Sequence, residues 1–476
     1  ALRALRTYGL HVRLGQLPPT LRRLRVHGVA AQLHAGAAQW AAALPRLEAL
    51  ELSRLPAARC VLGGLPHLRE ITVLHAHGAG DQSLELHALP ALEALRASFR
   101  GALRLGPGMA RAPLRLLHAH YLTEPLEGLT PAQARGLTDV VVGESAGTAL
   151  CRALGAGGGA RRLRRAELHT FLPAQLRRGE YDQLTIAGAL RLPWLAVPRA
   201  TELVVESIGN MQQVLGLDCP ATERLALRYF LNLRAATAPP GGLGRVRALE
   251  LHHCPGLGVA AINEMIQQCP GLQHLALGGV GAGDRAGAVA GAGVALVLRH
   301  AGLRRLEVEW DGDKAVHLER VDLGACPQLT DLSLHAPKRA QCFLSWGEGS
   351  LRLPPAIERV AWGYNCMFTE MYELMTQLPR ARRLGWHGYA RRRAVLQLEA
   401  LEELTLTLLP AVRTVDLTHC PRLRRLRVLR HRRARDYGAL RALILPPGVR
   451  EVHLPPECPR IRECLQRRAA PRVAEA

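Results

Sequence analysis

The sequence predicts an α/β solenoid, in which successive coils each add one short strand to a long parallel sheet. Two observations predict this fold. The pattern L-x-x-L-x-L recurs from one end of the 476-residue chain to the other. Its copies also keep a regular distance, since Leu251 and Leu277, which close two successive copies, are 26 residues apart. A fixed period of this length is typical of repeat architectures that stack one supersecondary unit per repeat.

The stretch 249–277 shows one complete coil. Leu249-Glu250-Leu251 alternates apolar and polar residues as a half-buried strand does, and 252–256 reads as a turn. Helical spacing follows at Val259, Ile262 and Ile266. Cys269-Pro270 ends that segment, and Leu275-Ala276-Leu277 begins the next strand. The period lies in the range of leucine-rich repeats. We therefore predict a leucine-rich repeat solenoid (horseshoe) with a parallel concave sheet and helices or turns on the convex side.

The first half of the chain carries the repeat with one interruption. Clear strand motifs occupy 21–26, 47–52, 68–73 and 92–95, and weaker ones follow at 114–117, 137–142 and 163–168. Between 169 and 198 the pattern blurs. This region is either a degenerate coil through Leu184-Thr185-Ile186 or an insertion, and the sequence leaves both open.

The second half regains the repeat and then shortens it. Strands are expected around 203, 225–227, 249–251, 275–277, 306–308 and 332–334, with convex segments long enough for helices, for example 288–300. After Trp386 the motifs 404–406, 415–417 and 426–428 lie only 11 residues apart. A helix does not fit into so short a coil. The coils over 398–465 are therefore strand-and-turn only, or half-coils. We predict one solenoid over 1–476, with coils over about 20–465.

Burial explains why such coils must stack, and it identifies the residues left for recognition. One coil buries too few leucines to offset its ordering entropy, so neighbouring coils bury each other's apolar faces. Trp362 and Trp386 fall at inward strand positions and are expected in the core. The residues between the leucines point outward along the concave sheet. The candidate partner-binding residues on this face are Glu250, His252, Glu307, Glu309, His335, Asp416, Arg425 and Arg427.

Eleven cysteines invite a disulfide or zinc interpretation, which their spacing does not favour. No Cys-x-x-Cys occurs, and six cysteines directly precede proline at one place in the repeat: Cys219, Cys254, Cys269, Cys326, Cys420 and Cys458. A small thiol packs there as a modest hydrophobe. We expect no metal site and no structural disulfide, and an intracellular location, cytoplasmic or nuclear.

One subclass of repeat is indicated by 254–277. Cys254-Pro255-Gly256-Leu257, Ile262 and the segment 268–277 resemble the cysteine-containing repeats of F-box/LRR proteins, the substrate receptors of cullin-type ubiquitin ligases. That resemblance implies a non-catalytic protein-interaction scaffold that forms the substrate-recognition arm of a ligase. No F-box helix signature occurs, and because Ala1 is followed at once by repeat-like sequence we expect a fragment of a longer chain. Plant-type immune receptor repeats, similar to 415–421, remain an alternative.

Charge raises a second functional class. The net charge is +22, and Lys314 and Lys338 are the only lysines, so arginine carries nearly all of it. The joint excess of Arg, Ala, Gly, Leu and Pro is typical of GC-rich codons, which favours a solvated surface. The densest run, at Arg422, Arg424, Arg425, Arg427, Arg430, Arg432, Arg433 and Arg435, nevertheless makes polyanion or RNA binding the alternative function.

An enzymatic function is the remote alternative. Gly143-Glu144-Ser145-Ala146-Gly147 follows a predicted strand and precedes a helical-looking 148–154, and it is similar to the nucleophile elbow of carboxylesterases. Ser145 would then be the nucleophile of a serine esterase. No His-Gly-Gly-Gly precedes it, and the shortened C-terminal coils leave no room for crossover helices. We therefore predict no enzyme and no cofactor, and no membrane span, because 286–298 is too short and too rich in glycine.

Overall fold

The structure, a computed structural model, describes most of the chain. The described residues are 2–8, 13–27, 37–53, 55, 58–74, 82–143, 150, 162–168, 180–188, 194–207, 213–279, 294–309, 316–335, 342–344, 351–362, 366–368, 376–389, 393–408, 412–429, 440–454 and 472–475. The predicted nucleophile Ser145 and the last four arginines of the C-terminal run lie outside them.

Two compact units divide the chain. Unit 1 comprises Ala1–Ile208 and Asp218–Thr222, and unit 2 comprises Gly209–Leu217 and Glu223–Ala476. Each unit is built from stacked coils of the kind that the sequence predicts. The continuity of one solenoid over 1–476 stays a prediction.

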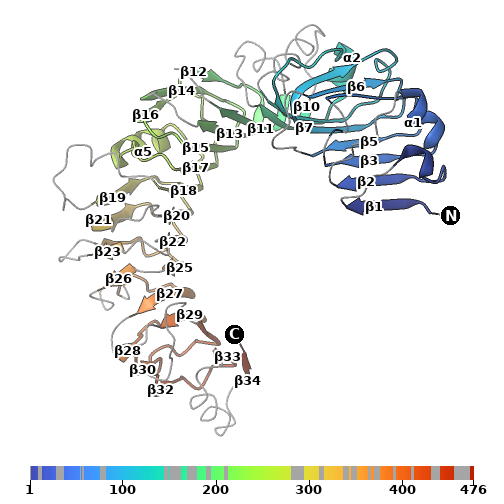
Figure 1. The fold of residues 1–476 in the computed structure, drawn as a ribbon. Helices are drawn as coiled ribbons and strands as arrows, with labels where there is room; N and C mark the ends of the chain where they lie inside the picture. The colour runs from blue at the N-terminus through green and yellow to red at the C-terminus, as the bar shows by residue number, and fades with distance from the viewer. Residues whose placement is uncertain are drawn as a thin grey trace. The chain divides into compact units, whose positions relative to one another are not determined.

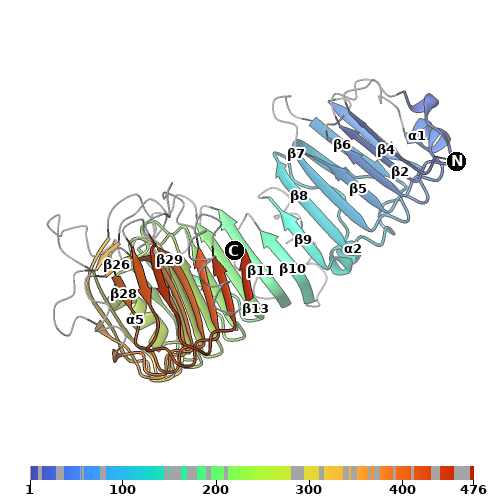
Figure 2. The same ribbon diagram turned by 90° about the horizontal axis from the view of Figure 1, so that it is seen from below.

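The motif sheet of unit 1 consists of the strands that carry the leucine motif (Figure 2). All of its neighbouring strands are parallel, and they are in register except for a shift between Ser98 and Gly101 of β7. In order they are β1 (Ala4–Tyr8), β2 (Arg23–His27), β3 (Ala49–Leu52), β5 (Glu70–Val73), β7 (Ala94–Leu105), β8 (Leu116–Leu122), β9 (Asp139–Val142), β10 (Arg162–Leu168), β11 (Glu180–Gly188) and β13 (Ala200–Ser207).

A second row of strands follows the first in three coils of unit 1. It contains β4 (Arg59–Gly63), β6 (Gln82–His87) and the C-terminal part of β7. Gly101 lies where β7 passes from one row to the other, at φ +143°, and a Cβ there would lie 1.7 Å from the Gln82 carbonyl oxygen. Only glycine fits this crossing. The remaining elements are η1 (Leu14–Gln16), α1 (Ala37–Ala43), α2 (Pro131–Gly136) and β12 (Trp194–Ala196).

The blurred region of the sequence contains a regular coil. In β11, Leu184 pairs with Ala166 of β10 and with Leu203 of β13. Leu184 and Ile186 are buried like the motif leucines of other strands. Of the two interpretations left open for 169–198, the described part therefore supports the degenerate coil.

The motif sheet of unit 2 repeats the same arrangement (Figure 1). Its strands are again parallel from β15 through β34, and they are in register except for a shift between His387 and Tyr389 of β27. In order they are β15 (Arg224–Arg228), β17 (Ala248–His252), β18 (His274–Gly278), β20 (Arg305–Glu309), β22 (Asp331–His335), β25 (Arg359–Trp362), β27 (Arg383–Tyr389), β29 (Glu403–Leu408), β31 (Arg425–Leu429), β33 (Glu451–Leu454) and β34 (Arg472–Glu475).

The other side of the coils in unit 2 is formed mainly by short strands, which Figure 1 shows as a second row beside the motif strands. These are β14 (Val214–Asp218), β16 (Ala235–Thr237), β19 (Val294–Arg299), β21 (Val316–Ala325), β23 (Cys342–Leu344), β24 (Leu351–Arg352), β26 (Cys366–Phe368), β28 (Arg393–Val395), β30 (Thr414–Asp416) and β32 (Ala442–Ile444). The helix predicted over 288–300 is wrong where it is described, because β19 pairs there with β21. The predicted helix after Gly258 is confirmed as α5 (Val259–Gln267).

The short C-terminal repeats are half-coils. β29, β31 and β33 pair within the motif sheet, whereas β28, β30 and β32 pair with one another in a separate sheet. Motifs 11 residues apart in the sequence therefore lie on alternate sides of a full coil.

The core lies between the two rows of strands, and the inward motif positions fill it. Trp362 and Trp386 are register partners with exposed fractions of 0 and 2%, which confirms their predicted core position. The cysteine slot is also confirmed as buried at Cys219, Cys254, Cys269, Cys326 and Cys420, while Cys458 lies outside the described residues.

Candidate functional site

The outward face of the unit 2 motif sheet is ordered by strand register. In β17 the first, third and fifth residues are half-buried, while Leu249 and Leu251 are buried. Parallel pairing then sets residues of equal position side by side on successive strands. The third positions from β17 to β31 are occupied by Glu250, Ala276, Glu307, Ser333, Ala361, Gly385, Thr405 and Arg427.

Seven of the eight predicted partner-binding residues lie on this face. They are Glu250 and His252 on β17, Glu307 and Glu309 on β20, His335 on β22, and Arg425 and Arg427 on β31. Glu309 and His335 are register partners. The rest are not gathered into one cluster, because β18 separates β17 from β20 and three strands separate β22 from β31. Their role in binding stays a prediction.

Asp416 is placed differently from the prediction. It ends β30, which belongs to the separate sheet with β28 and β32, and it is buried. Its carboxylate accepts hydrogen bonds from the Thr418 hydroxyl at 2.7 Å and from the Thr418 amide at 3.2 Å, and it pairs with Arg393 at 3.3 Å. Asp416 therefore holds a turn and is not on the face that carries Glu250.

Several predicted residues are held in ion pairs along the sheet. Glu250 lies 3.3 Å from Arg228, and Glu307 pairs with Arg305 and with His274. Each pair is partly exposed, and such pairs contribute about 0–1 kcal/mol each. Their main effect is to neutralise charge on the face, and their contribution to the free energy of unfolding is small.

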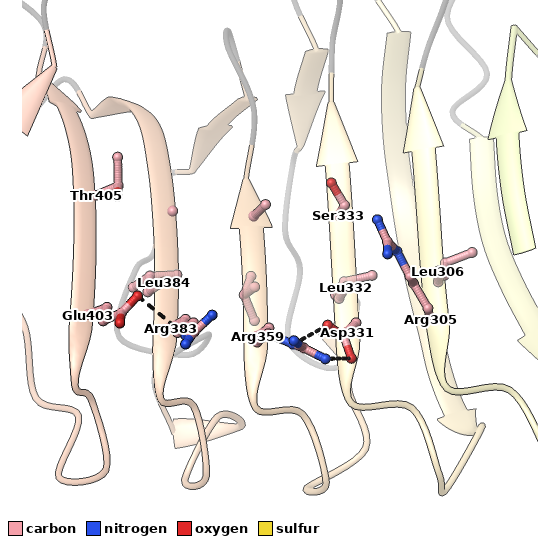
Figure 3. A pocket seen from close by; sticks show the side chains of 13 residues that line it. Arg305, Leu306, Asp331, Leu332, Ser333, Arg359, Arg383, Leu384, Glu403 and Thr405 are labelled. Atoms are coloured by element: carbon pink, nitrogen blue, oxygen red, sulfur yellow. Dashed lines mark hydrogen bonds and ion pairs between the residues drawn. The ribbon is translucent and has the colours of Figure 1, made fainter. Parts of the chain in front are cut away.

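A hollow of about 420 Å³ lies on this face across β20, β22, β25, β27 and β29 (Figure 3). It is lined by Arg305, Leu306, Asp331, Leu332, Ser333, Arg359, Val360, Ala361, Arg383, Leu384, Gly385, Glu403 and Thr405. All of them belong to unit 2. None of these residues is among the eight predicted to bind a partner.

Small side chains create the hollow. Ser333, Ala361, Gly385 and Thr405 occupy the third position on four successive strands. Larger side chains stand at the same position on either side, namely Glu307 on β20 and Arg427 on β31. The signal was readable in the sequence as Val-Ala-Trp and Leu-Gly-Trp at 360–362 and 384–386, where the middle residue of the strand motif is small.

Charged residues at the first strand position form one rim of the hollow. The order from β20 to β29 is Arg305, Asp331, Arg359, Arg383 and Glu403. Arg359 pairs with Asp331 through both ends of its guanidinium, one contact being 2.9 Å from Nη2 to Oδ2, and Arg383 Nε lies 3.3 Å from a Glu403 oxygen (Figure 3). The bond to Asp331 raises the pKa of the Arg359 guanidinium, which is charged at every ordinary pH.

The arginines of the rim nevertheless remain accessible. The side chains of Arg305, Arg359 and Arg383 are 60, 58 and 59% exposed. Each of them pairs with a carboxylate, Arg305 with Glu307, Arg359 with Asp331 and Arg383 with Glu403, and the exposed parts of their guanidinium groups remain available as hydrogen-bond donors. Donors of this kind suit carboxylate and backbone carbonyl groups of a partner.

Metal binding and cysteine reactivity can be judged for the described residues. No group of three or more His, Cys, Asp or Glu side chains among them could hold a metal ion. Burial raises the pKa of the Cys60, Cys219 and Cys269 thiols to about 12, which removes them as nucleophiles. The described part of the chain also contains no helix long and apolar enough to cross a membrane.

Comparison with known proteins finds likeness only among solved structures. Neither a protein-family profile nor a curated protein matches the sequence. The chain of TLR13 in a TLR13–ssRNA13 complex is 13% identical, with a TM-score of 0.49 and coverage of 95% of this chain and 74% of that one. YopM from Yersinia enterocolitica WA-314 is 16% identical, with a TM-score of 0.34 and coverage of 94% and 90%.

The fold assignment rests on the strands of this chain. In both units the leucine motif recurs strand after strand in parallel pairing and its leucines are buried, and a second row of strands accompanies the motif sheet in three coils of unit 1 and along unit 2. Each unit is therefore a leucine-rich repeat solenoid.

Proposed function

We propose that this protein is a non-catalytic protein-recognition scaffold, and that the hollow over β22 to β29 receives a segment of its partner. The observation that carries the proposal is the run of small residues at one strand position, from Ser333 to Thr405, beside accessible charges. A regular solenoid face has side chains of mixed size at this position, so four small ones in succession leave a depression that a partner side chain can fill.

The lining favours a protein partner over a small molecule. Small-molecule sites are mostly apolar and enclose the greater part of their ligand. This hollow is open, and its rim carries Arg305, Arg359 and Arg383 in accessible positions. Interfaces between proteins combine a packed centre with a polar, solvated rim, and arginine is enriched in them. Solenoids use extended faces of this kind for binding.

The more specific proposal is a substrate-recognition arm in a ubiquitin ligase of the F-box/LRR type. It is supported by the resemblance of 254–277 to the repeats of that family. This role predicts that a protein bound in the hollow becomes ubiquitylated, and that a variant with a filled hollow loses both binding and ubiquitylation.

The polyanion alternative at the C-terminal coils receives less support. Arg425 is held between Glu403 at 3.0 Å and Glu451 at 3.2 Å, so its charge is balanced on both sides. Acidic residues therefore interrupt the described part of the arginine run. The remainder of the run, from Arg430 to Arg435, lies outside the described residues.

A filling substitution tests the proposed function. A Cβ at Gly385 would meet only ordinary contacts, the nearest being 3.7 Å from Ala361 Cα, so Gly385→Leu should fold and fill the hollow. Gly271→Leu is the matched control, because Gly271 is exposed and its Cβ would also have no neighbour nearer than 3.7 Å.

The measurement is the affinity of both variants for a partner first identified by proximity labelling and then purified. We expect Gly385→Leu to weaken binding at least tenfold, about 1.4 kcal/mol, and Gly271→Leu to leave it unchanged. Unchanged binding by a folded Gly385→Leu variant would show that the hollow is not the partner site.

A further inference from the structure

The first two coils of unit 1 carry positive charge that nearby acidic residues balance only in part. The first 47 residues contain seven arginines and no aspartate or glutamate. Ion pairs reach Arg22 and Arg25 only from the third coil, where Glu48 and Glu51 each lie 3.0 Å away. Among the described residues no acidic partner pairs with Arg3, Arg6 or Arg23, and all three are exposed.

Strand register gathers this charge on one face. β1 and β2 are parallel neighbours, and their odd positions point outward because Leu5, Leu24 and Val26 occupy the inward ones. The outward register pairs are Ala4 with Arg23, Arg6 with Arg25, and Tyr8 with His27. Arginines therefore occupy one end of this face, and two aromatic rings occupy the other.

Tyr8 and His27 form a ring stack in which Tyr8 is exposed, while the His27 side chain is 20% exposed and lies 3.7 Å from Glu51. The Tyr8 and His27 ring centroids are 5.0 Å apart with an interplanar angle of 15°, and the Arg6 guanidinium lies 5.0 Å from the Tyr8 ring centroid. Tyr8 keeps 61% of its surface exposed. An aromatic residue that packs in the core is buried, as Trp40 is, whereas Tyr8 is exposed.

We propose that the outward face of β1 and β2 binds single-stranded nucleic acid. Arg3, Arg6 and Arg23 would neutralise phosphates, while the planar groups of Tyr8, His27 and Arg6 would stack on bases. Accessible arginines beside a stacking platform are the two elements that single-strand binding requires. A single strand can lie along this sheet face with its bases against the rings, whereas the bases of a duplex are paired and stacked inside it, so we assign the single-stranded form.

This site is separate from the hollow proposed for a protein partner. It lies in unit 1, and its residues differ from those of the C-terminal arginine run. On the described part of that run, glutamates stand beside the arginines at the same strand position, as Glu403 and Glu451 do beside Arg425. On β1 and β2 no carboxylate occupies any position, and on β3 Glu51 stands beside Arg25 while Ala49 stands beside Arg23.

The experiment is fluorescence anisotropy of the full chain with a labelled oligothymidine of about 12 nucleotides, a length within the usual range of single-strand sites. Binding is measured over a series of salt concentrations. The charge variant is Arg6→Gln with Arg23→Gln, and the matched control is Arg111→Gln with Arg115→Gln, which removes the same charge from exposed positions elsewhere in unit 1. The stacking variant is Tyr8→Ala, with Tyr8→Phe as its conservative counterpart.

We expect the charge variant to bind at least tenfold more weakly and to have a shallower salt dependence, by about one unit of slope for each phosphate that is no longer neutralised. Tyr8→Ala should weaken binding at least fivefold without changing the slope, because stacking releases no counterions. Tyr8→Phe and the control pair should bind like the wild type. All these positions are exposed, so circular dichroism should show the same fold in every variant.

Three results would overturn the proposal. The first is an absence of oligothymidine binding at low salt. The second is equal loss in the charge variant and in the control pair, which would show that only net charge matters. The third is unchanged binding by Tyr8→Ala together with equally tight binding of inorganic polyphosphate, which would reduce the face to a charge patch without stacking.

Discussion

At Cys254, Cys326 and Cys420 the recurring slot before proline makes the thiol a buried donor. Cys254 Sγ lies 3.6 Å from the Leu227 carbonyl oxygen, and Cys326 and Cys420 donate to the carbonyls of Leu298 and Leu396 at 3.5 Å. Each thiol thereby reaches back to the preceding coil. Burial raises the pKa of Cys254 to about 11 and that of Cys269 to about 12, so neither forms a thiolate near neutral pH.

These thiols should not react in the native protein. We expect iodoacetamide at a pH of about 7.5 to leave Cys219, Cys254 and Cys269 unmodified, because the reagent attacks thiolates and the side chains are buried. The same residues should be fully alkylated in denaturant. Peptide mass spectrometry of native and unfolded samples measures both states, and native labelling at these positions would contradict the burial.

Asp416 should contribute stability that depends on pH. Hydrogen bonds from Thr418 and the Arg393 ion pair lower the pKa of this carboxyl below its ordinary 3.8. Because the folded pKa is the lower one, the contribution is complete above about pH 3.8 and is lost as the pH falls through the folded value. Asp416→Asn should therefore melt at a lower temperature than the wild type at pH 7, and the difference should shrink towards pH 3.

Glu399→Gln provides the control for this pH dependence. Glu399 is exposed, and it lies between β28 and β29 in the same short C-terminal coils. Its substitution should leave the melting temperature unchanged across the same pH series. A difference between wild type and Asp416→Asn that stays constant from pH 7 to pH 3 would show that the carboxylate charge is not responsible.

At the scale of elements, α5 is fixed to the next coil by one side chain. The apolar face of the helix buries Ile262, Met265 and Ile266. On its flank, Asn263 Nδ2 donates to the Val297 carbonyl at 2.6 Å, and Asn263 Oδ1 accepts from the Arg299 amide at 3.1 Å. The asparagine thus pairs with the backbone of β19 as another strand would.

Asn263→Ala should loosen β19 from α5. The substitution leaves a carbonyl and an amide of β19 without their partner, which costs about 1–3 kcal/mol where these groups stay buried. Hydrogen exchange should accelerate at 294–299 and remain unchanged in β17. The neighbouring Glu264→Ala is the control, and equal exchange in both variants would contradict the role of Asn263.

At the scale of the whole molecule, each coil of a solenoid is stable only against its neighbours. In unit 2 the inward positions form continuous columns across the motif sheet, one of which runs through Leu334, Trp362, Trp386, Leu406 and Val428. Cross-strand ion pairs accompany these columns on the outward face. The exposed ion pairs contribute little to the free energy of unfolding. Burial of the apolar side chains in the columns therefore dominates stability.

Trp386→Ala should therefore destabilise more than its own coil. Truncating a fully buried tryptophan costs about 3–5 kcal/mol, and the loss is shared with β25 and β29 on either side. We expect a lower unfolding midpoint in urea and faster hydrogen exchange in all three strands. Trp194→Ala removes an equally large side chain that is 42% exposed and should change the midpoint little. A similar loss in both variants would contradict this account.

The repeat and its core followed from the sequence because they depend on local spacing. The buried leucines, Trp362 and Trp386, the helix after Gly258 and the cysteine slot are all set by periodicity within one coil. The outward positions could also be predicted from the sequence, because neighbouring residues on a strand alternate between the two faces of the sheet. This is why Glu250, Glu307 and Arg427 were correctly assigned to the outward face of the motif sheet.

Only the tertiary structure decided which coil positions meet. Asp416 was misplaced because Val415-Asp416-Leu417 matches the motif locally, and only strand pairing assigns β30 to the other side of a half-coil. The helix expected over 288–300 failed because β21 was available to pair with β19, and pairing between coils overrides local propensity. The hollow and the Tyr8–His27 stack likewise depend on register, which brings together residues about 20–28 positions apart that no local pattern connects.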